Sequence, residues 1–125
     1  MSKAKIGIDF GGSNLKIARF NDDQLDVIRM TPGYSLKTLP TILTDLRQFN
    51  PEAIGVSCPG DIDYQKGSIT KSLRLGTDIP ISEIVRQSLN KNDLPVYLLN
   101  DAQAAGLAEL HLGAGNEKDD FLFIN

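Results

Sequence analysis

Tryptophan is absent from this chain of 125 residues, and cysteine and histidine occur once each. The single cysteine, Cys58, excludes a disulfide within the chain, and with no partner base in evidence it is expected to be a packed thiol. The single histidine, His111, cannot form the cluster of ligands that a zinc site needs. The chain also lacks a signal sequence and an apolar run long enough to cross a bilayer. These absences indicate a cytoplasmic protein with no membrane partner.

An excess of basic residues is also missing. The chain carries 13 Lys and Arg residues against 16 Asp and Glu, which gives a formal net charge of −3. Nucleic-acid-binding domains usually present a basic face, so we expect no nucleic-acid partner. What is present is an ordinary mixture, 41% hydrophobic and 23% charged. That mixture and the length are typical of one globular domain with its own core.

The start of the chain carries the most informative motif. Residues 5–20 read KIGIDFGGSNLKIARF, which predicts two strands joined by a tight glycine turn. Adjacent glycines leave the backbone N–H groups of Gly11 and Gly12 unobstructed, so these groups can point at a phosphate, and Ser13 adds a hydroxyl donor. Asp9 ends the first strand with a hard oxygen ligand suited to Mg²⁺ or to water bound to it.

This turn fits neither of the better-known glycine motifs. The Walker A loop and the Rossmann fingerprint are both followed by a helix, whereas a strand follows here. An ordinary hairpin with a glycine turn therefore stands beside the phosphate-binding interpretation.

A second motif lies at residues 96–109, VYLLNDAQAAGLAE, where a short strand ends at Asn100 and an alanine-rich helix begins. As a helix N-cap, Asp101 would stabilise that helix and be held charged by its dipole. As a functional residue at the carboxyl end of a strand, Asp101 could instead take a proton from a hydroxyl nucleophile. Both interpretations remain open on the sequence.

Hydrophobic periodicity predicts the remaining elements. Apolar residues at helical spacing predict two amphipathic helices, and short apolar runs bounded by turn residues predict strands. We expect strands at about 5–10, 15–20, 25–29, 53–57, 96–99 and 121–125, helices at 39–48, 81–90 and 102–112, and a loop with a short hairpin at 61–72.

Together these motifs resemble the ROK family (repressors, open reading frames and kinases) of the actin-like ATPase superfamily, over essentially the whole chain. Residues 9–16, DFGGSNLK, are similar to the family's first phosphate motif. Residues 54–63, IGVSCPGDID, with Gly67 beyond them, are similar to its Pro-Gly loop on the sugar side, and residues 100–109 to its catalytic-base segment. The resemblance extends to glucokinases, including those that use polyphosphate. It implies a ribonuclease-H-like α/β fold, a mixed sheet with an antiparallel meander followed by parallel strands and flanking helices.

The resemblance also implies a mechanism and a set of partners. The partners would be a sugar and a nucleotide, with ATP or polyphosphate as donor and Mg²⁺ as cofactor, and the family also allows a homodimer. The implied roles are general base for Asp101, sugar binding for Asn100, Asp101, Gly60 and Asp61, phosphate binding for Gly11, Gly12, Ser13 and Lys16, and the Mg²⁺ site for Asp9.

The resemblance further implies that residues 1–125 are the N-terminal half domain of a longer sugar kinase. Residues 121–125, FLFIN, would start the strand that leads into a missing C-terminal half, where the family has its second phosphate motif. An Asn-rich segment ending in Trp, common in the family's glucokinases, is absent here, so the sugar is open. Ser72 or Lys71 could replace its contacts, but we favour ordinary loop roles for both.

Two non-enzymatic alternatives stand beside the kinase. Repressors of the family sense sugars on the same fold but carry a DNA-binding segment ahead of the first strand, which here begins almost at once. An actin-like regulatory or assembly domain is the other alternative. Carboxylates at two strand ends, Asp9 and Asp101, favour the enzyme, because a scaffold has no need of them.

Overall fold

The computed structural model describes residues 4–21 and 24–100. In chain order these residues form β1 (Lys5–Phe10), β2 (Asn14–Asn21), β3 (Gln24–Pro32), α1 (Leu39–Thr44), the 3₁₀ helix η1 (Asp45–Phe49), β4 (Ala53–Cys58), β5 (Asp61–Asp63), β6 (Ser68–Ser72), β7 (Gly76–Ile79), α2 (Ile81–Leu89) and β8 (Val96–Asn100).

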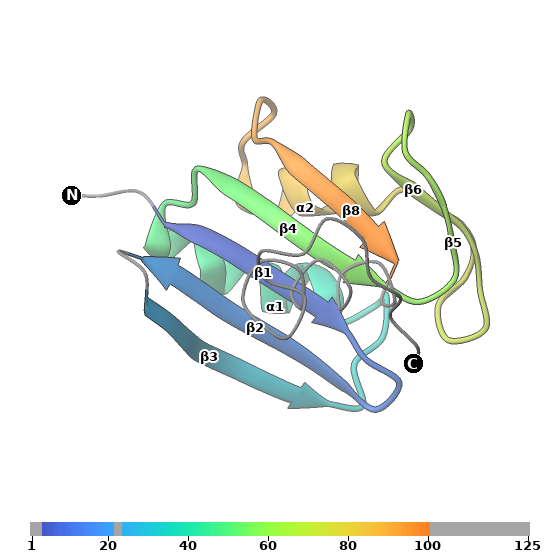
Figure 1. Ribbon diagram of the computed structural model, residues 1–125, viewed down its shortest axis with the longest axis horizontal. Coiled ribbons are helices and arrows are strands. Elements are labelled where there is room, and N and C mark those ends of the chain that lie inside the picture. The colour runs from blue at the N-terminus through green and yellow to red at the C-terminus, as the bar shows by residue number, and fades with distance from the viewer. Residues whose placement is uncertain (1–3, 22–23, 101–125) are drawn as a thin grey trace, which may run out of the picture.

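A five-stranded mixed sheet in the order β3-β2-β1-β4-β8 forms the body of the protein (Figure 1). The first three strands are an antiparallel meander, and β4 and β8 then add to β1 in parallel. This confirms the predicted α/β class and the predicted meander. The strands are longer than predicted at β2 and β3, where the pairing runs on to the turn at Gly33.

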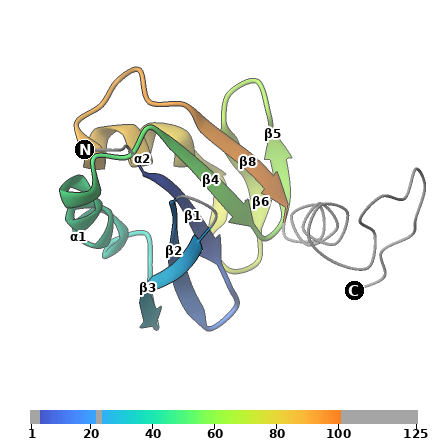
Figure 2. The same ribbon diagram turned by 60° about the vertical axis from the view of Figure 1, so that its left-hand side comes forward.

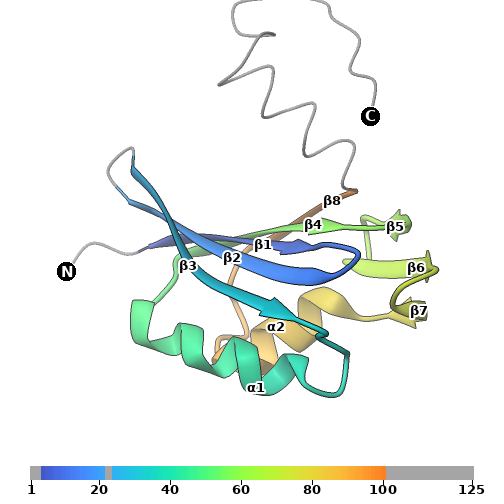
Figure 3. The same cartoon turned by 90° about the horizontal axis from the view of Figure 1, so that it is seen from below.

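One face of this sheet is covered by α1 and α2 (Figure 3). Along β1 the residues alternate between the two faces, so that Ile6, Ile8 and Phe10 are buried beneath the helices while Asp9 faces away from them. The core therefore lies between the sheet and the helices, and the opposite face of the described sheet carries the polar side chains discussed below.

The first helix is shorter than predicted, because the α-helix gives way to the 3₁₀ helix η1 after Thr44. The chain then leaves at Asn50 in the left-handed conformation (φ 46°), and the amide of Asn50 donates to the carbonyl of Arg47, three residues back. A 3₁₀ last turn of this kind is common at helix ends. The second helix, α2, matches its predicted range to within one residue and buries Ile81, Val85 and Leu89.

A second, three-stranded sheet of β5, β6 and β7 lies beside the carboxyl ends of β4 and β8 (Figure 2). Only a short hairpin was predicted in this region, and β7 was not. Its sequence, GTDI, contains two residues that disfavour strands, Gly76 at φ 106° and Asp78 at φ 53°. Pairing with β6 overrides these local preferences.

The predicted helix at 102–112 and the predicted strand at 121–125 lie outside the described residues. Within the part of the chain that the structure describes, no helix has the length and apolar character needed to span a membrane.

Candidate functional site

The carboxyl ends of three neighbouring parallel strands bring the predicted site residues together. Asp9 on β1 is in register with Ser57 on β4, and Cys58 is in register with Asn100 on β8. The glycine turn follows β1 and the Pro-Gly loop follows β4, so both leave the sheet at this edge (Figure 1). Ligand sites of open α/β sheets lie at such an edge.

The glycine turn between β1 and β2 is closed by its own backbone. The amide of Gly11 donates to the carbonyl of Asn14 at 3.0 Å, and a Cβ at Gly11 would lie 2.8 Å from that oxygen. Glycine is therefore required at this position by close backbone approach. Among the described residues no hydrogen bond is donated by the amides of Gly12 or Ser13, which are both exposed. These two amides, rather than that of Gly11, are the ones left to meet a phosphate.

Two hydrogen bonds from the segment after β3 also hold the turn in place. The amide of Gly33 donates to the carbonyl of Ser13 at 3.1 Å, and the hydroxyl of Tyr34 donates to the carbonyl of Gly11 at 2.7 Å. Burial raises the pKa of the Tyr34 phenol above its ordinary value, so it stays a protonated donor at neutral pH.

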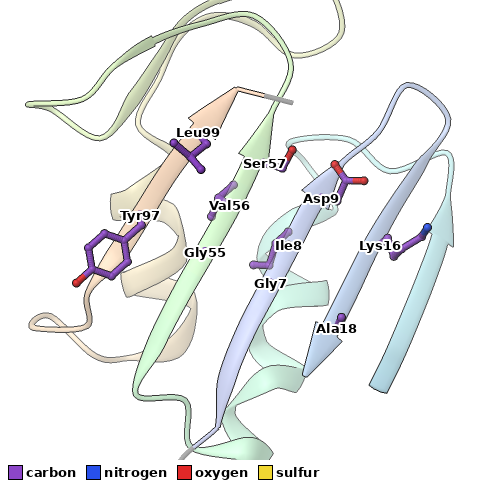
Figure 4. Close-up of a pocket in the computed structure, with 10 residues that line it drawn as sticks. All are labelled: Gly7, Ile8, Asp9, Lys16, Ala18, Gly55, Val56, Ser57, Tyr97 and Leu99. Carbon is purple, nitrogen blue, oxygen red and sulfur yellow. The ribbon is translucent and has the colours of Figure 1, made fainter. Parts of the chain in front are cut away.

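A polar row crosses the sheet beside the turn. Lys16 on β2, Asp9 on β1 and Ser57 on β4 occupy paired positions and lie on the same face, away from the helices (Figure 4). Within the described part of the chain, the Asp9 carboxylate has neither a hydrogen bond nor an ion pair. Sequence reasoning gave no role to Ser57. Its position between buried Val56 and Cys58 is the signal that places it on the open face.

The Asp9 carboxylate fits a Mg²⁺ site of the kind that handles phosphates. Mg²⁺ in such sites is held by one or two carboxylates together with water and substrate phosphate oxygens. Asp9 is exposed and uncommitted among the described residues, and the hydroxyl of Ser57 is its neighbour across the strand pair. No group of three His, Cys, Asp or Glu side chains gathers in the described ranges.

The rest of this face is a shallow hollow of about 360 Å³. Apart from the polar row, it is bordered by mostly small or apolar residues, namely Gly7, Ala18, Gly55, Tyr97 and Leu99, together with Ile8 and Val56, which are themselves buried in the sheet. The charged chemistry of the hollow is therefore confined to the end beside the glycine turn.

The Pro-Gly loop is held tightly against the small sheet. Gly60 has φ 99°, and a Cβ there would lie 2.1 Å from the carbonyl oxygen of Lys71 and 3.0 Å from the Cα of Ser72. Asp61, the next residue, is exposed at the start of β5. Ser72 is buried, and its hydroxyl oxygen accepts hydrogen bonds from the backbone amides of Arg74 and Leu75. Ser72 thus shapes its own loop, which agrees with the role favoured for it on the sequence.

The close approach at Gly60 leads to a stability prediction. Gly60→Ala should lower the free energy of unfolding by at least about 2 kcal/mol, because backbone strain at positive φ adds to the clash with the β6 backbone. Gly76→Ala is the matched control, since Gly76 has φ 106° but no atom within 4 Å of its Cβ position. Urea unfolding of both variants should show the larger loss for Gly60→Ala. Equal losses would mean that the close approach costs nothing.

The family follows from comparison with known proteins. Residues 5–125 match the profile of the ROK family. The chain belongs to the ROK family.

Two curated relatives illustrate the range of the ROK family. The chain is 30% identical over 130 residues to a polyphosphate glucokinase of Mycobacterium leprae, covering 95% of this chain and 39% of that protein. It is 32% identical over 73 residues to a xylose repressor of Caldicellulosiruptor bescii, covering 58% of this chain and 18% of that protein. The chain spans about two fifths of the curated kinases that it matches over nearly its whole length.

A solved ROK structure supports the same architecture. The ROK hexokinase from Thermus thermophilus superposes with a TM-score of 0.71 at 28% identity, covering 87% of this chain and 39% of that one. The five-stranded sheet with its small antiparallel sheet is thus a ROK fold.

One predicted ROK site residue, Asp101, lies outside the described residues, as does His111. The described sheet ends at Asn100, which is half-buried on β8 and adjacent in register to Cys58. Cys58 is fully buried, in agreement with a packed thiol.

Proposed function

We propose that this chain supplies the sugar-binding and phosphate-binding half of a ROK sugar kinase, which transfers the terminal phosphoryl group of ATP or polyphosphate to a sugar hydroxyl. The observation that carries the proposal is the shared edge of β1, β4 and β8. There a glycine turn with exposed amides and an uncommitted carboxylate at Asp9 lies beside a Pro-Gly loop and Asn100. Similarity to a polyphosphate glucokinase supports a sugar acceptor and polyphosphate as a donor.

The proposed site has a phosphate-binding side at the glycine turn and a sugar-binding side at the Pro-Gly loop. The amides of Gly12 and Ser13 and the ammonium group of Lys16 would hold donor phosphates, and Asp9 would hold Mg²⁺, which neutralises charge on the phosphate oxygens. On the other side, Gly60, Asp61 and Asn100 would line the sugar pocket. Gly11 would act through the shape of the turn, because its own amide is already hydrogen-bonded to Asn14.

Asp101 completes the reaction in this proposal. Its carboxylate accepts the proton of the sugar hydroxyl, and the hydroxyl oxygen forms a bond to the terminal phosphorus. The bond from that phosphorus to its bridging oxygen breaks, which releases ADP or a polyphosphate shortened by one unit. Phosphoryl transfer depends mainly on positioning and on neutralising charge, and these residue types supply both.

A sugar-sensing regulator is the second candidate function, because the chain is also similar to a xylose repressor over 73 residues. The whole protein distinguishes the two candidates when it is tested against a panel of hexoses, glucosides and N-acetyl sugars with ATP or polyphosphate. A kinase gives sugar phosphate with at least one pair. A protein that binds a sugar by calorimetry, yet forms no product with either donor, would be a regulator.

Residues 1–125 alone should form no sugar phosphate above a no-enzyme control. They contain one phosphate turn, and the relatives are more than twice as long. A coupled assay on pure protein, run beside the whole protein at equal molar concentration, checks this expectation. Clear turnover by the 125 residues would show that one phosphate turn is enough to use the donor.

A further inference from the structure

Tyr34 connects the hydrophobic core to the glycine turn. Tyr34 is 2% exposed, its ring packs against Phe10 with centroids 5.7 Å apart, and its hydroxyl donates to the carbonyl of Gly11 at 2.7 Å. This bond joins residues 23 positions apart in the chain. Because the ring is packed in the core, the hydrogen bond from its hydroxyl restricts the position of the glycine turn relative to the sheet.

Arg74 approaches the same tyrosine from the opposite side of the site. Its guanidinium carbon lies 4.7 Å from the centre of the Tyr34 ring, and Nη2 donates to the Tyr34 carbonyl at 2.8 Å. Among the described residues Arg74 forms no ion pair. The guanidinium of Arg74 thus stacks on one aromatic ring and donates to one backbone carbonyl at the same time. The flexible ammonium group of lysine does not reproduce this geometry.

Arg74 is in turn fixed to the Pro-Gly loop. It follows β6, where buried Ser72 accepts the amide of Arg74 at 3.2 Å. The backbone of Lys71 and Ser72 is the surface against which Gly60 packs. An unbroken series of contacts therefore runs from the sugar-side loop through Arg74 and Tyr34 to the phosphate turn.

We propose that Tyr34 and Arg74 are positioning residues that set the spacing between the phosphate turn and the Pro-Gly loop. This rests on the proposed kinase function, in which the donor lies on the turn and the sugar on the loop. A misplacement of about 1 Å between reacting groups can cost about 100-fold in rate, so a pair that fixes the two loops affects kcat more than either binding constant. Neither side chain needs to touch a substrate for this effect.

The test uses the whole protein and two conservative variants. Tyr34→Phe keeps the ring and its stacking and removes only the hydroxyl, and Arg74→Lys keeps the charge and removes the planar donor group. Each should lower kcat about 10-fold, with the dissociation constants of sugar and donor changed less than about twofold. The double variant should lose less than the product of the two, because both changes release the same contact series.

Ser88→Ala is the matched control. It removes a hydroxyl that donates to a backbone carbonyl, that of Ile84, at the same distance of 2.7 Å, but within α2 and away from the site. Its melting temperature should fall by about as much as that of Tyr34→Phe, with kcat unchanged. If Tyr34→Phe lost stability but kept its kcat, the tyrosine would be structural only and the proposal would be wrong.

Amide hydrogen exchange provides a readout that does not depend on turnover. Peptides covering residues 10–15 should exchange faster in Tyr34→Phe and Arg74→Lys than in wild type or Ser88→Ala. If wild-type protein phosphorylates no sugar, the kinase function fails, and the exchange data still decide whether the two residues fix the turn. Unchanged exchange in both variants would overturn the positioning role whatever the activity.

Discussion

The whole protein with Asp101→Asn is expected to lose at least about 100-fold in kcat while it still binds sugar and melts close to wild type. Asn is nearly as good a helix N-cap as Asp, so the change should cost little in folding. An amide cannot accept the hydroxyl proton, and general-base assistance is worth about 10²–10⁴ in rate. Steady-state kinetics, sugar titration by calorimetry and a thermal melt together separate the two roles that the sequence leaves open.

The control for this substitution is Asp93→Asn, which makes the same chemical change at an exposed residue of the loop before β8, at the opposite end of that strand from Asn100. It should leave kcat unaltered. Near-normal kcat in Asp101→Asn would make Asp101 a helix cap only, and Asp61, exposed at the start of β5 directly after the Pro-Gly loop, would become the first alternative for the base.

Asp9→Ala should produce the second large effect, a fall of about 100-fold in kcat/KM for the donor at fixed Mg²⁺ with sugar affinity unchanged. Asp9 lies near the end of β1 beside the glycine turn, on the side proposed for the phosphates, and its carboxylate has no hydrogen bond or ion pair among the described residues. Donor saturation curves at several Mg²⁺ concentrations measure the effect. Part of the loss should be recovered at high Mg²⁺, because the metal also binds through the phosphates.

Asp26→Ala serves as its control, since Asp26 is an exposed strand carboxylate on the same sheet, 3.5 Å from Arg19. Its kinetic constants should stay at wild-type values. If Asp9→Ala abolished sugar binding and left the use of donor intact, the phosphate and sugar sides of the proposed site would be reversed.

The fold was largely predictable because its elements have strong local patterns. The alternating apolar residues of β1 and the helical spacing of Ile81, Val85 and Leu89 each reflect one buried face. β7 could not be predicted, because Gly76 and Asp78 disfavour a strand and only its partner β6 makes it one. The 3₁₀ ending of the first helix depends likewise on the backbone at Asn50 rather than on periodicity.

For the candidate site, local motifs indicated which segments to examine but not how they contact one another. The glycine turn, Asp9 and Asn100 were all predicted from the sequence, and the structure places them at the carboxyl ends of neighbouring strands. The use of the Gly11 amide within the turn depends on backbone geometry that no pattern of residue types encodes. The contact between Tyr34 and Arg74 could not be predicted, because it joins segments 40 positions apart and neither residue belongs to a recognised motif.

The small sheet has an evolutionary consequence. Its three strands form one continuous stretch of chain between β4 and α2, whereas the glycine turn belongs to the β1–β2 hairpin, so the two lie on separate stretches of chain. If the Pro-Gly loop holds the sugar as proposed, mutations in residues 61–79 can alter which acceptor a lineage uses without touching the donor machinery. Change within that stretch is restricted at Gly67, where a Cβ would meet the side chain of Ser82. If the positioning proposal holds, it is restricted again at Arg74, because losing that arginine would release Tyr34 and with it the glycine turn.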